Sequence, residues 1–383
     1  MSVEWNFPTR IVYGVGAVSE VGEALLRDGQ RTVLIVADTG VIDAGVVTDV
    51  EKSLRKAKIA FETFAEVASN PSEAQVRAAA AAFQAAGAQA VVAVGGGSVI
   101  DVAKLARMLA AAPTSLDAGF DADGKTPLSL PVLPPLIAVP TTAGAGSEVG
   151  MSATFTAAAT GRKARLTGAA LLPDLAVLDP QMTLSLPPAT TAATGFDALT
   201  HAIEAYCASG LHPMADVLAL RAMELVVAHL EPVVREGNDI ESRGQLLVAA
   251  CMAAVAAQKG LGACHALAYP LASCTDLHHG LANALCLPAV IDFNRSAAPE
   301  QVADVAQRLG VRGDDVETLA FECSGAVRAL RRKCGLPDGL ESVGVADEQL
   351  PPLAALAFAE PSHVHNPRAC TIEDLLALYR ASL

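Results

Sequence analysis

The sequence has little positive charge and no long apolar run. Its 383 residues include 27 Lys and Arg against 41 Asp and Glu, which gives a formal net charge of -14. An acidic chain without basic clusters is a poor candidate for binding nucleic acid or an anionic membrane. Although 52% of the residues are hydrophobic, no apolar stretch reaches the roughly 18 residues of a membrane span without a charge, a proline or a turn residue. These features predict a soluble protein.

The chain also lacks the marks of a secreted protein. Residues 1–6 contain neither the basic segment nor the apolar segment of a secretory signal. All eight cysteines lie in the second half, and no two of them form a CxxC pair. A secreted chain of this length would more often spread paired cysteines along its length. We therefore expect a cytoplasmic protein with reduced thiols and no cysteine-bound metal.

The pattern of hydrophobic residues changes near residue 184. Before it, short apolar runs at residues 32–37, 90–94 and 136–139 alternate with helical patterns such as residues 72–86. Buried strands separated by helices predict a parallel sheet covered on both faces. After it, the chain reads as long Ala- and Leu-rich helices. A chain of this length suggests roughly two domains, and we expect an α/β dinucleotide-binding domain at 1–183 and an all-α domain at 184–383.

A glycine-rich loop directly follows the second apolar run. The segment VGGGSVIDVAK, residues 94–104, runs from the expected strand into an expected helix, with Ser98 placed to cap it. Glycines allow close approach of a ligand, and the free N–H groups of a helix start suit a pyrophosphate. The loop is neither GxGxxG nor a Walker loop, so a simple tight turn is the alternative. A second loop, TTAGAGS at 141–147, also follows a strand and favours a shared ligand.

Asp38 ends the first apolar run. A carboxylate at this position can accept hydrogen bonds from a ribose diol and repels a 2′-phosphate, which favours NAD over NADP. The alternative is that Asp38 only starts a helix or a turn.

Four residues in the second half have the spacing and chemistry of a metal site. Asp197 and His201 are four apart in a helical stretch and project from one face, and His265 and His279 follow downstream. One carboxylate and three imidazoles suit a divalent transition metal such as Fe²⁺ or Zn²⁺ with a position open for substrate. Each histidine alone would more often be an ordinary polar or core residue, but the four together favour a site.

These segments resemble the iron-containing (group III) alcohol dehydrogenase family over nearly the whole chain. The resemblance rests on GGGSVIDVAK, PTTAGAGSEV, ATGFDALTHAIEAY, GLGACHALAYPL, HHGLANALCLP and the late HNPR. It implies an N-terminal dinucleotide domain, a helical metal domain, the active site in the cleft and a homodimer or larger homo-oligomer. It assigns the metal to Asp197, His201, His265 and His279. It assigns the dinucleotide to Asp38, Asn70, Gly96, Gly97, Ser98, Asp101, Thr141, Thr142 and Lys163.

The resemblance has one departure. Many family members have a histidine with a proton-relay role four residues after the third ligand, where this chain has Tyr269. A phenol with a pKa of about 10 is a poorer shuttle, and His278 is the available substitute. The alternative for His278 is a supporting or surface residue.

Three residues suggest a substrate with an anionic end, such as a semialdehyde or a phosphono- or sulfo-aldehyde. Lys259 lies six residues before His265, where many simple alcohol dehydrogenases have an uncharged residue. Arg165 would share a strand face with Lys163, and Ser152 replaces a larger amide of several relatives. The alternative, which we weigh slightly higher, is that both cations are solvated surface charges.

The combined prediction is an NAD- and metal-dependent dehydrogenase of a small aldehyde or primary alcohol. Three alternatives stay open: a dehydroquinate-synthase-like lyase, a maleylacetate-reductase-like enzyme, and a nucleotide-binding protein without catalysis. The ligand pattern DALTH, HxxxY and HHG favours the dehydrogenase over the lyase. The four ligand positions argue against the other two alternatives.

Overall fold

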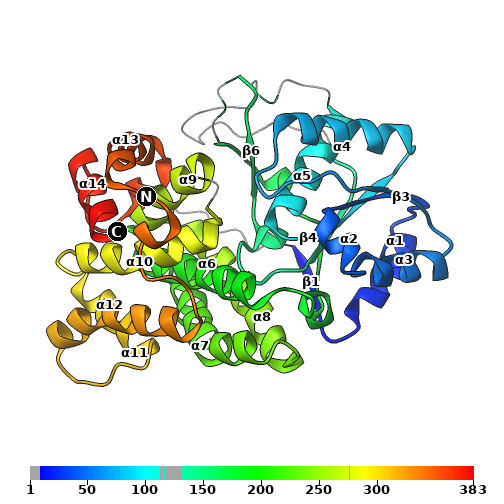
Figure 1. The fold of residues 1–383 in the computed structure, drawn as a ribbon. Helices are drawn as coiled ribbons and strands as arrows, with labels where there is room; N and C mark the ends of the chain where they lie inside the picture. Colours follow the sequence, from blue (N-terminus) through cyan, green and yellow to red (C-terminus); the bar gives the residue numbers. More distant parts are fainter. Residues whose placement is uncertain (1–8, 113–115, 117–131, 160, 162, 276) are drawn as a thin grey trace. The chain divides into compact units, whose positions relative to one another are not determined.

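A computed structural model describes residues 9–112, 116, 132–159, 161, 163–275 and 277–383 (Figure 1). Contacts divide the chain into two compact units. The α/β unit holds the described residues up to Thr142 together with Gly146–Leu186, and the helical unit holds Ala143–Ala145 and Pro187–Leu383. The main break therefore falls between Leu186 and Pro187, three residues after the position expected from composition.

The α/β unit contains a six-stranded sheet in the order β1-β8-β5-β4-β2-β3, in which every neighbouring pair is parallel. The three predicted strands are confirmed as β2, β4 and β5. The strands are β1 (Arg10–Tyr13), β2 (Thr32–Ala37), β3 (Ala60–Phe64), β4 (Ala90–Gly95), β5 (Leu136–Pro140) and β8 (Leu175–Leu178). Because they run in parallel, their carboxyl ends share one edge, where ligands of open α/β sheets bind.

Helices cover both faces of this sheet, as predicted. The helices are α1 (Val21–Arg27), α2 (Thr39–Asp43), α3 (Val47–Lys56), α4 (Glu73–Ala85) and α5 (Gly97–Ala111). Side chains at alternate positions of a strand point to opposite faces, so Leu34 packs with α4 and α5 while Ile35 packs with α1 and α3. Ser72 caps α4 through a reciprocal capping box with Gln75, which explains why the helix begins there.

A two-stranded antiparallel hairpin follows the second glycine-rich loop. Strand β6 (Ser152–Thr156) pairs with β7 (Lys163–Thr167), with Thr154 opposite Arg165. Ala153 and Phe155 of β6 are buried in the core beside α5, so the alternate side chains form the other face.

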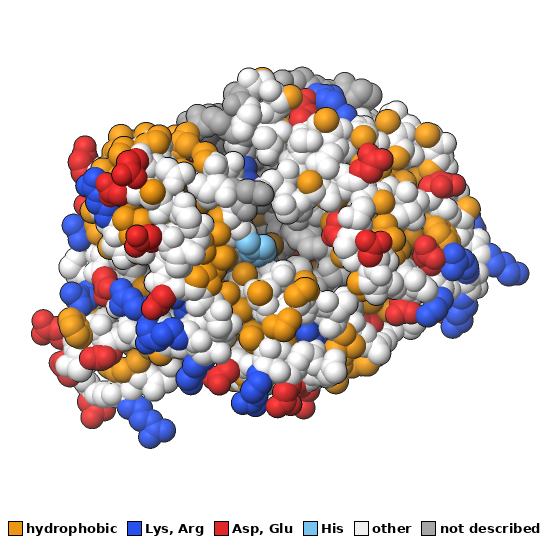
Figure 2. All heavy atoms as spheres, viewed as in Figure 1, with side chains coloured by type: hydrophobic (Ala, Val, Ile, Leu, Met, Phe, Trp, Pro, Cys, Tyr) orange, Lys and Arg blue, Asp and Glu red, His pale blue; other side chains and the backbone are white. Residues whose placement is uncertain are grey.

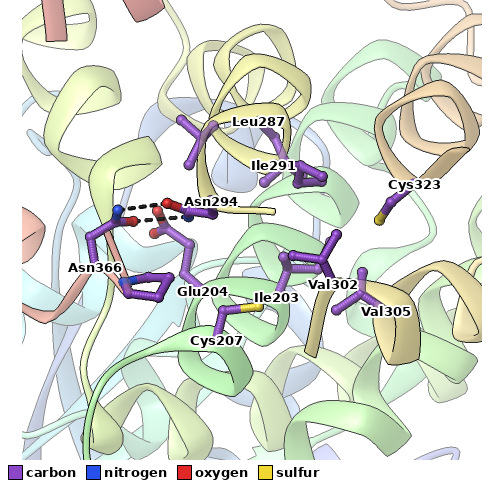
Figure 3. Close-up of a pocket in the computed structure, with 12 residues that line it drawn as sticks. Ile203, Glu204, Cys207, Leu287, Ile291, Asn294, Val302, Val305, Cys323 and Asn366 are labelled. Atoms are coloured by element: carbon purple, nitrogen blue, oxygen red, sulfur yellow. Dashed lines mark hydrogen bonds between the residues drawn. The ribbon is translucent and has the colours of Figure 1, made fainter. Parts of the chain in front are cut away.

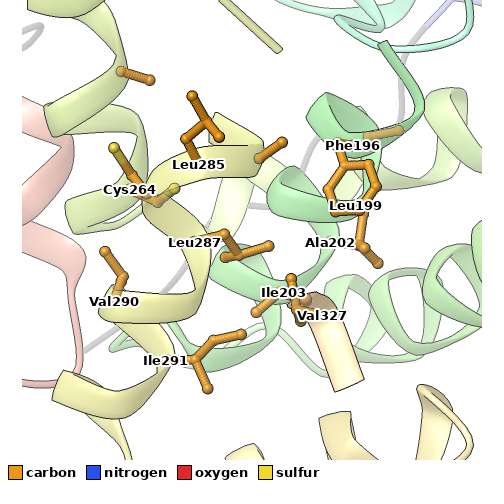
Figure 4. Close-up of a cluster of buried hydrophobic side chains, with 14 of the residues drawn as sticks. Phe196, Leu199, Ala202, Ile203, Cys264, Leu285, Leu287, Val290, Ile291 and Val327 are labelled. Carbon is orange, nitrogen blue, oxygen red and sulfur yellow. The ribbon is translucent and has the colours of Figure 1, made fainter. Parts of the chain in front are cut away.

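The second unit is helical, as predicted. It contains α6 (Pro188–Cys207), α7 (Pro213–Arg235), α8 (Ile240–Ala256), α9 (Ala263–Cys274), α10 (His279–Asn294), α11 (Pro299–Arg308), α12 (Val316–Lys333), α13 (Leu350–Ala359) and α14 (Ile372–Ala381). Its core joins α6, α9, α10 and α12 through residues such as Leu199, Leu287 and Val327 (Figure 4). Small alanines let these helices pack closely, and Gly280 is required where α10 meets α6, since a Cβ would lie 2.2 Å from the carbonyl oxygen of Ala193.

One described segment, Ile240–Lys259, is long and apolar enough to cross a membrane by length and composition, although the run contains charges. Most of it, 61% of its most apolar window, is buried inside the protein, as in the core helix of a soluble protein. On the face drawn in Figure 2, Lys and Arg are interspersed with Asp and Glu. Six of the eight cysteines are buried, and the described residues form no disulfide.

Candidate metal and dinucleotide sites

The structure brings together three of the four predicted metal ligands within the helical unit. One ligand atom from each of Asp197, His265 and His279 lies within 4.8 Å of the other two. The Asp197 Oδ1 atom is 3.9 Å from Nε2 of His265 and 3.8 Å from Nε2 of His279. These residues come from α6, α9 and the first position of α10, so the packing of three helices creates the cluster.

His201 lies one turn after Asp197 on α6, as its spacing predicts. Its Nδ1 atom is 3.8 Å from Asp197 Oδ1, and its ring centroid is 4.4 Å from that of His265. The Nδ1 atom is buried and has no hydrogen-bond partner among the described residues. His201 is therefore beside the cluster with a nitrogen available, and its role as the fourth ligand stays a prediction.

The protonation states of these groups suit a divalent cation. Burial, together with the neighbouring His265, lowers the pKa of His201 to about 4. Burial alone would raise the pKa of Asp197, but the imidazoles of His201, His279 and His265 lower it below its usual value. A neutral His201 and an ionised Asp197 are the forms in which these side chains bind metal, and the Asp/His donor set fits Fe²⁺ or Zn²⁺.

Two further polar residues contact the cluster, and the sequence analysis missed both. Glu204 is on α6, and its Oε2 atom lies 2.5 Å from Nδ1 of His265. Asn283, on α10, donates from Nδ2 to Asp197 Oδ1 at 2.8 Å and is fully buried. Helical spacing could have identified them, because Glu204 follows Asp197 by seven residues and Asn283 follows His279 by four.

Tyr269 and His278, the two relay candidates, both border the cluster. The ring of Tyr269 stacks on His279 with 4.8 Å between centroids and lies 6.0 Å from His265. His278 is exposed and precedes the first residue of α10. Tyr269 thus touches a predicted ligand through its ring, while His278 is adjacent to that ligand along the chain.

In the α/β unit, the two glycine-rich loops meet at the carboxyl ends of β4 and β5. The backbone N–H of Thr141 donates to the carbonyl of Gly95. A Cβ on Gly96 would lie 3.3 Å from the hydroxyl of Thr142. The predicted convergence of these loops is therefore present in the structure.

The expected capping role of Ser98 is wrong. Helix α5 begins at Gly97, with Gly96 as its N-cap and no capping side chain, while the Ser98 hydroxyl donates to the carbonyl of Ser69 at 2.6 Å. That bond joins the loop to the segment containing Asn70, another predicted contact. Because glycine offers no side-chain acceptor, the first N–H groups of α5 stay available for a ligand.

The side chain of Asp101 is committed to the protein rather than exposed at the loop. It is buried and accepts hydrogen bonds from Ser147 Oγ at 2.5 Å and from N and Oγ1 of Thr154. Lys104, one turn later, donates to Ser147, Gly150 and Ser152. These contacts hold the segment from the second loop to β6 in place, so we assign Asp101 a supporting role.

Asp38 has the helix-starting role considered for it, and its contact with the ribose stays a prediction. It ends β2, and its side chain caps α2 by accepting from the N–H of Val41 at 2.9 Å. It is half-buried. A single hydrogen bond from the backbone leaves acceptor capacity on the carboxylate, so a ribose contact is compatible with the cap.

The three predicted substrate residues belong to two different units. Ser152 and Arg165 lie on the β6–β7 hairpin of the α/β unit, and Arg165 shares a strand face with Lys163, as expected. Lys259 belongs to the helical unit and is 7% exposed at its side chain. Its ammonium donates to Asp216 Oδ1 at 2.6 Å and to the carbonyl of Tyr206 at 2.9 Å. Because this charge is already paired, the structure argues against Lys259 as the receptor of a substrate anion.

The structure thus combines a parallel-sheet unit, which has a glycine-rich loop at the start of a helix, with a helical unit that bears an Asp/His cluster. This is the arrangement expected of a metal-dependent oxidoreductase. Residues 8–180 match the family described as iron-containing alcohol dehydrogenase, and residues 191–383 match the C-terminal domain of the Fe-containing alcohol dehydrogenase family. The chain belongs to the iron-containing alcohol dehydrogenase family.

Individual relatives align over nearly the full chain. The 4-hydroxybutyrate dehydrogenase of Cupriavidus necator is 38% identical, with 98% of each chain covered. The NAD-dependent methanol dehydrogenase of Bacillus methanolicus is 34% identical, again with 98% of each chain covered. A crystal structure of 1,3-propanediol oxidoreductase superposes with a TM-score of 0.96 at 32% identity and covers all of both chains.

These comparisons confirm the predicted family, the two-domain architecture and the class of enzyme, an NAD-dependent alcohol dehydrogenase of the iron-containing type. The family is one of soluble enzymes. The substrate, the bound metal and the individual roles of the site residues are matters for the proposal below.

Proposed function

We propose that the protein transfers a hydride between NAD(H) and a small aldehyde or primary alcohol at a divalent metal held by Asp197, His201, His265 and His279. The observation that supports this most is the buried cluster of Asp197, His265 and His279, with ligand atoms within 4.8 Å of one another. When bound, the metal supplies a Lewis acid for the substrate oxygen and NAD supplies the hydride carrier. Iron is the metal of the family's name, and zinc would fit the same donors.

The chain's own residues bind and orient the dinucleotide. We assign the pyrophosphate to the N–H groups at Gly96, Gly97 and Ser98, where the positive end of α5 stabilises negative charge. Thr141 and Thr142 offer hydroxyls beside this loop, and Asn70 and Lys163 complete the proposed contacts. Asp38 is proposed to accept from the adenosine ribose and to disfavour a 2′-phosphate.

Proton transfer is assigned to Tyr269 or His278. Tyr269 stacks on His279, which places its ring against the proposed ligand, and its hydroxyl can exchange a proton with the substrate oxygen or with water. His278 carries an imidazole, the side chain that most often acts as a general acid or base, and it is exposed beside His279. Replacing Tyr269 by Phe separates the two: an unchanged kcat would assign the proton to His278.

Within the substrate class, we propose an aldehyde with an anionic far end, such as a semialdehyde or a phosphono- or sulfo-aldehyde. The similarity to an enzyme named for 4-hydroxybutyrate, a hydroxy acid, supports this choice. We assign recognition of the anion to Arg165, which lies on the same hairpin face as the proposed dinucleotide contact Lys163, with Ser152 leaving space on that face. Comparing succinic semialdehyde with butyraldehyde in the parent and in Arg165→Met tests this, and equal kcat/KM on both aldehydes in the parent refutes it.

The reaction itself is tested by removing metal and restoring it. Chelated protein should not oxidise NADH with any short aldehyde, and added Fe²⁺ or Zn²⁺ should restore the activity. A lyase of the dehydroquinate-synthase type would instead show no net NADH consumption. Undiminished NADH oxidation in metal-free protein would refute the proposed mechanism. A homodimer or larger homo-oligomer and a cytoplasmic location stay predictions.

A further inference from the structure

Helix α9, which begins two residues before His265, has an N-terminus that distant side chains cap. The first N–H groups of a helix have no partner within it, and the N-cap here is Gly262, which has no side chain. Instead, Glu204 of α6 accepts from the N–H of Cys264 at 2.6 Å and of His265 at 3.4 Å. Asn366, in the late HNPR segment, accepts from the N–H of Ala263 at 3.2 Å.

Gly262 is needed for this arrangement. A Cβ at that position would lie 2.8 Å from Oε1 of Glu204 and 2.9 Å from Oδ1 of Asn366. The two caps therefore approach the backbone as closely as a glycine allows. This fixes the start of α9, and with it the backbone of His265, against α6 and the C-terminal segment.

Glu204 also contacts the imidazole of His265 directly. Its Oε2 lies 2.5 Å from Nδ1, and both residues are buried, at 4% and 0% exposure. Both carboxylate oxygens already accept backbone N–H groups, so Glu204 acts as an acceptor and Nδ1 carries the proton. The other nitrogen, Nε2, then presents its lone pair toward Asp197.

We propose that Glu204 is a positioning residue for the metal, which selects the Nδ1–H tautomer of His265 and aims its Nε2 lone pair at the ion. This inference rests on the metal site proposed above. A carboxylate behind a metal-bound histidine orients the ring and increases its basicity, and losing such a partner typically weakens metal binding about 10–100-fold.

The surroundings leave no substitute for this acceptor among the described residues. Asn366 and Asn294 bind each other through two amide hydrogen bonds of 2.7 and 3.0 Å (Figure 3). Together with Glu204 they line a cavity of about 10 Å³ whose other walls are largely apolar. Such a space holds about one water at most, so solvent has little room to replace the acceptors of Glu204.

Glu204→Gln tests the proposal, since an amide has one accepting end and one donating end. If the NH₂ end faces His265, Nδ1 must accept and Nε2 becomes protonated, which prevents metal binding through it. If the oxygen faces His265, the NH₂ end opposes the N–H of Cys264. We expect Zn²⁺ affinity, measured by competition with a chromophoric chelator, to fall about 10–100-fold while NAD affinity is unchanged.

The tautomer is read directly in metal-free protein by ¹⁵N NMR of labelled histidines, with His265→Ala assigning the signals. The parent should show His265 as Nδ1–H. Asn366→Ala is the matched control, because it removes a cap from the same helix end without touching the ring. It should lower the melting temperature, keep the tautomer and cost less Zn²⁺ affinity than Glu204→Gln.

The outcomes separate this inference from the site on which it depends. Equal Zn²⁺ affinity in the parent and His265→Ala would refute the metal site itself. If His265→Ala does weaken Zn²⁺ binding, the inference about Glu204 can still fail. It is overturned if the parent protein shows His265 as the Nε2–H tautomer. It is overturned equally by parent-like Zn²⁺ affinity in Glu204→Gln, or by equal losses in Glu204→Gln and Asn366→Ala with no change of tautomer.

Discussion

Replacing Glu148 by Gln should change the pH dependence of stability in a direction that the structure determines. Glu148 follows the second glycine-rich loop and is 3% exposed. Burial raises the pKa of its carboxyl from 4.5 to about 7, against the opposing effects of a backbone hydrogen bond and the nearby Lys104. The folded protein therefore holds a proton that the unfolded chain has lost between these two pH values.

This difference destabilises the folded state as the pH rises. Between pH 4.5 and about 7, each pH unit lowers the free energy of unfolding by about 1.4 kcal/mol. The reason is that the folded protein must either keep a proton on Glu148 or bury its charge. The sum over this interval is roughly 3 kcal/mol, and the pKa on which it rests already includes the opposing effect of Lys104. We therefore compare the free energy of unfolding of Glu148→Gln with that of the parent at each pH. The difference should be about 1–3 kcal/mol more favourable to the variant at pH 8 than at pH 4.5.

Urea denaturation of metal-free protein at pH 4.5 and pH 8 measures this double difference. Glu73→Gln is a control of opposite sign, because hydrogen bonding to Arg77 lowers the pKa of Glu73 and its carboxylate stabilises the fold at higher pH. That variant should lose more stability at pH 8 than at pH 4.5, because the Glu73 carboxyl of the unfolded chain is about half protonated at the lower pH. A Glu148→Gln effect that is equal at the two pH values would refute the reasoning.

Three further predictions concern the two sites. Asp38→Gly should relax discrimination against NADPH, while the loss of the helix cap should lower stability by only a few tenths of a kcal/mol. The measurement is kcat/KM with each coenzyme, and a parent that already prefers NADPH would contradict the assigned ribose contact. Lys259→Met should lower stability by leaving Asp216 unpaired, yet keep the ratio of kcat/KM for succinic semialdehyde and butyraldehyde; a ratio that collapses would restore Lys259 as the anion receptor. Asn283→Ala should weaken Zn²⁺ binding and lower the free energy of unfolding by about 1.5–3 kcal/mol, since it removes a buried hydrogen bond to a carboxylate; calorimetry showing neither loss would exclude a role for Asn283 in holding Asp197.

Strands β2, β4 and β5 could be predicted from the sequence because they are almost wholly buried apolar runs. Strand β8 is equally buried but was missed, because its run of four residues is too short to stand out. Strand β4 is an unbroken apolar run, and all of its residues are buried. The edge strands β1 and β3 were missed, because most of their residues are exposed or partly exposed and the sequence shows no continuous apolar run. A strand paired on one side only has less need of such a run.

The site could be predicted only as far as local spacing and resemblance reach. Asp197 and His201 share a helix face by geometry, while their meeting with His265 and His279 was implied by the family. The pairing of Lys259 with Asp216 could not be predicted, because the two residues lie 43 positions apart in the chain and no local pattern joins them. The cap of α5 was misplaced for a related reason: the Ser98 hydroxyl bonds to Ser69, 29 residues upstream.

The most direct measurement of the central claim is the metal content of the parent and of a His265→Ala, His279→Ala double variant, taken with their NADH-linked aldehyde reduction. The account predicts about one Fe²⁺ or Zn²⁺ per active parent chain. It predicts little or no metal in the double variant, with turnover lower by orders of magnitude, because losing a Lewis acid removes several kcal/mol of transition-state stabilisation. A metal-free double variant with full activity would contradict it.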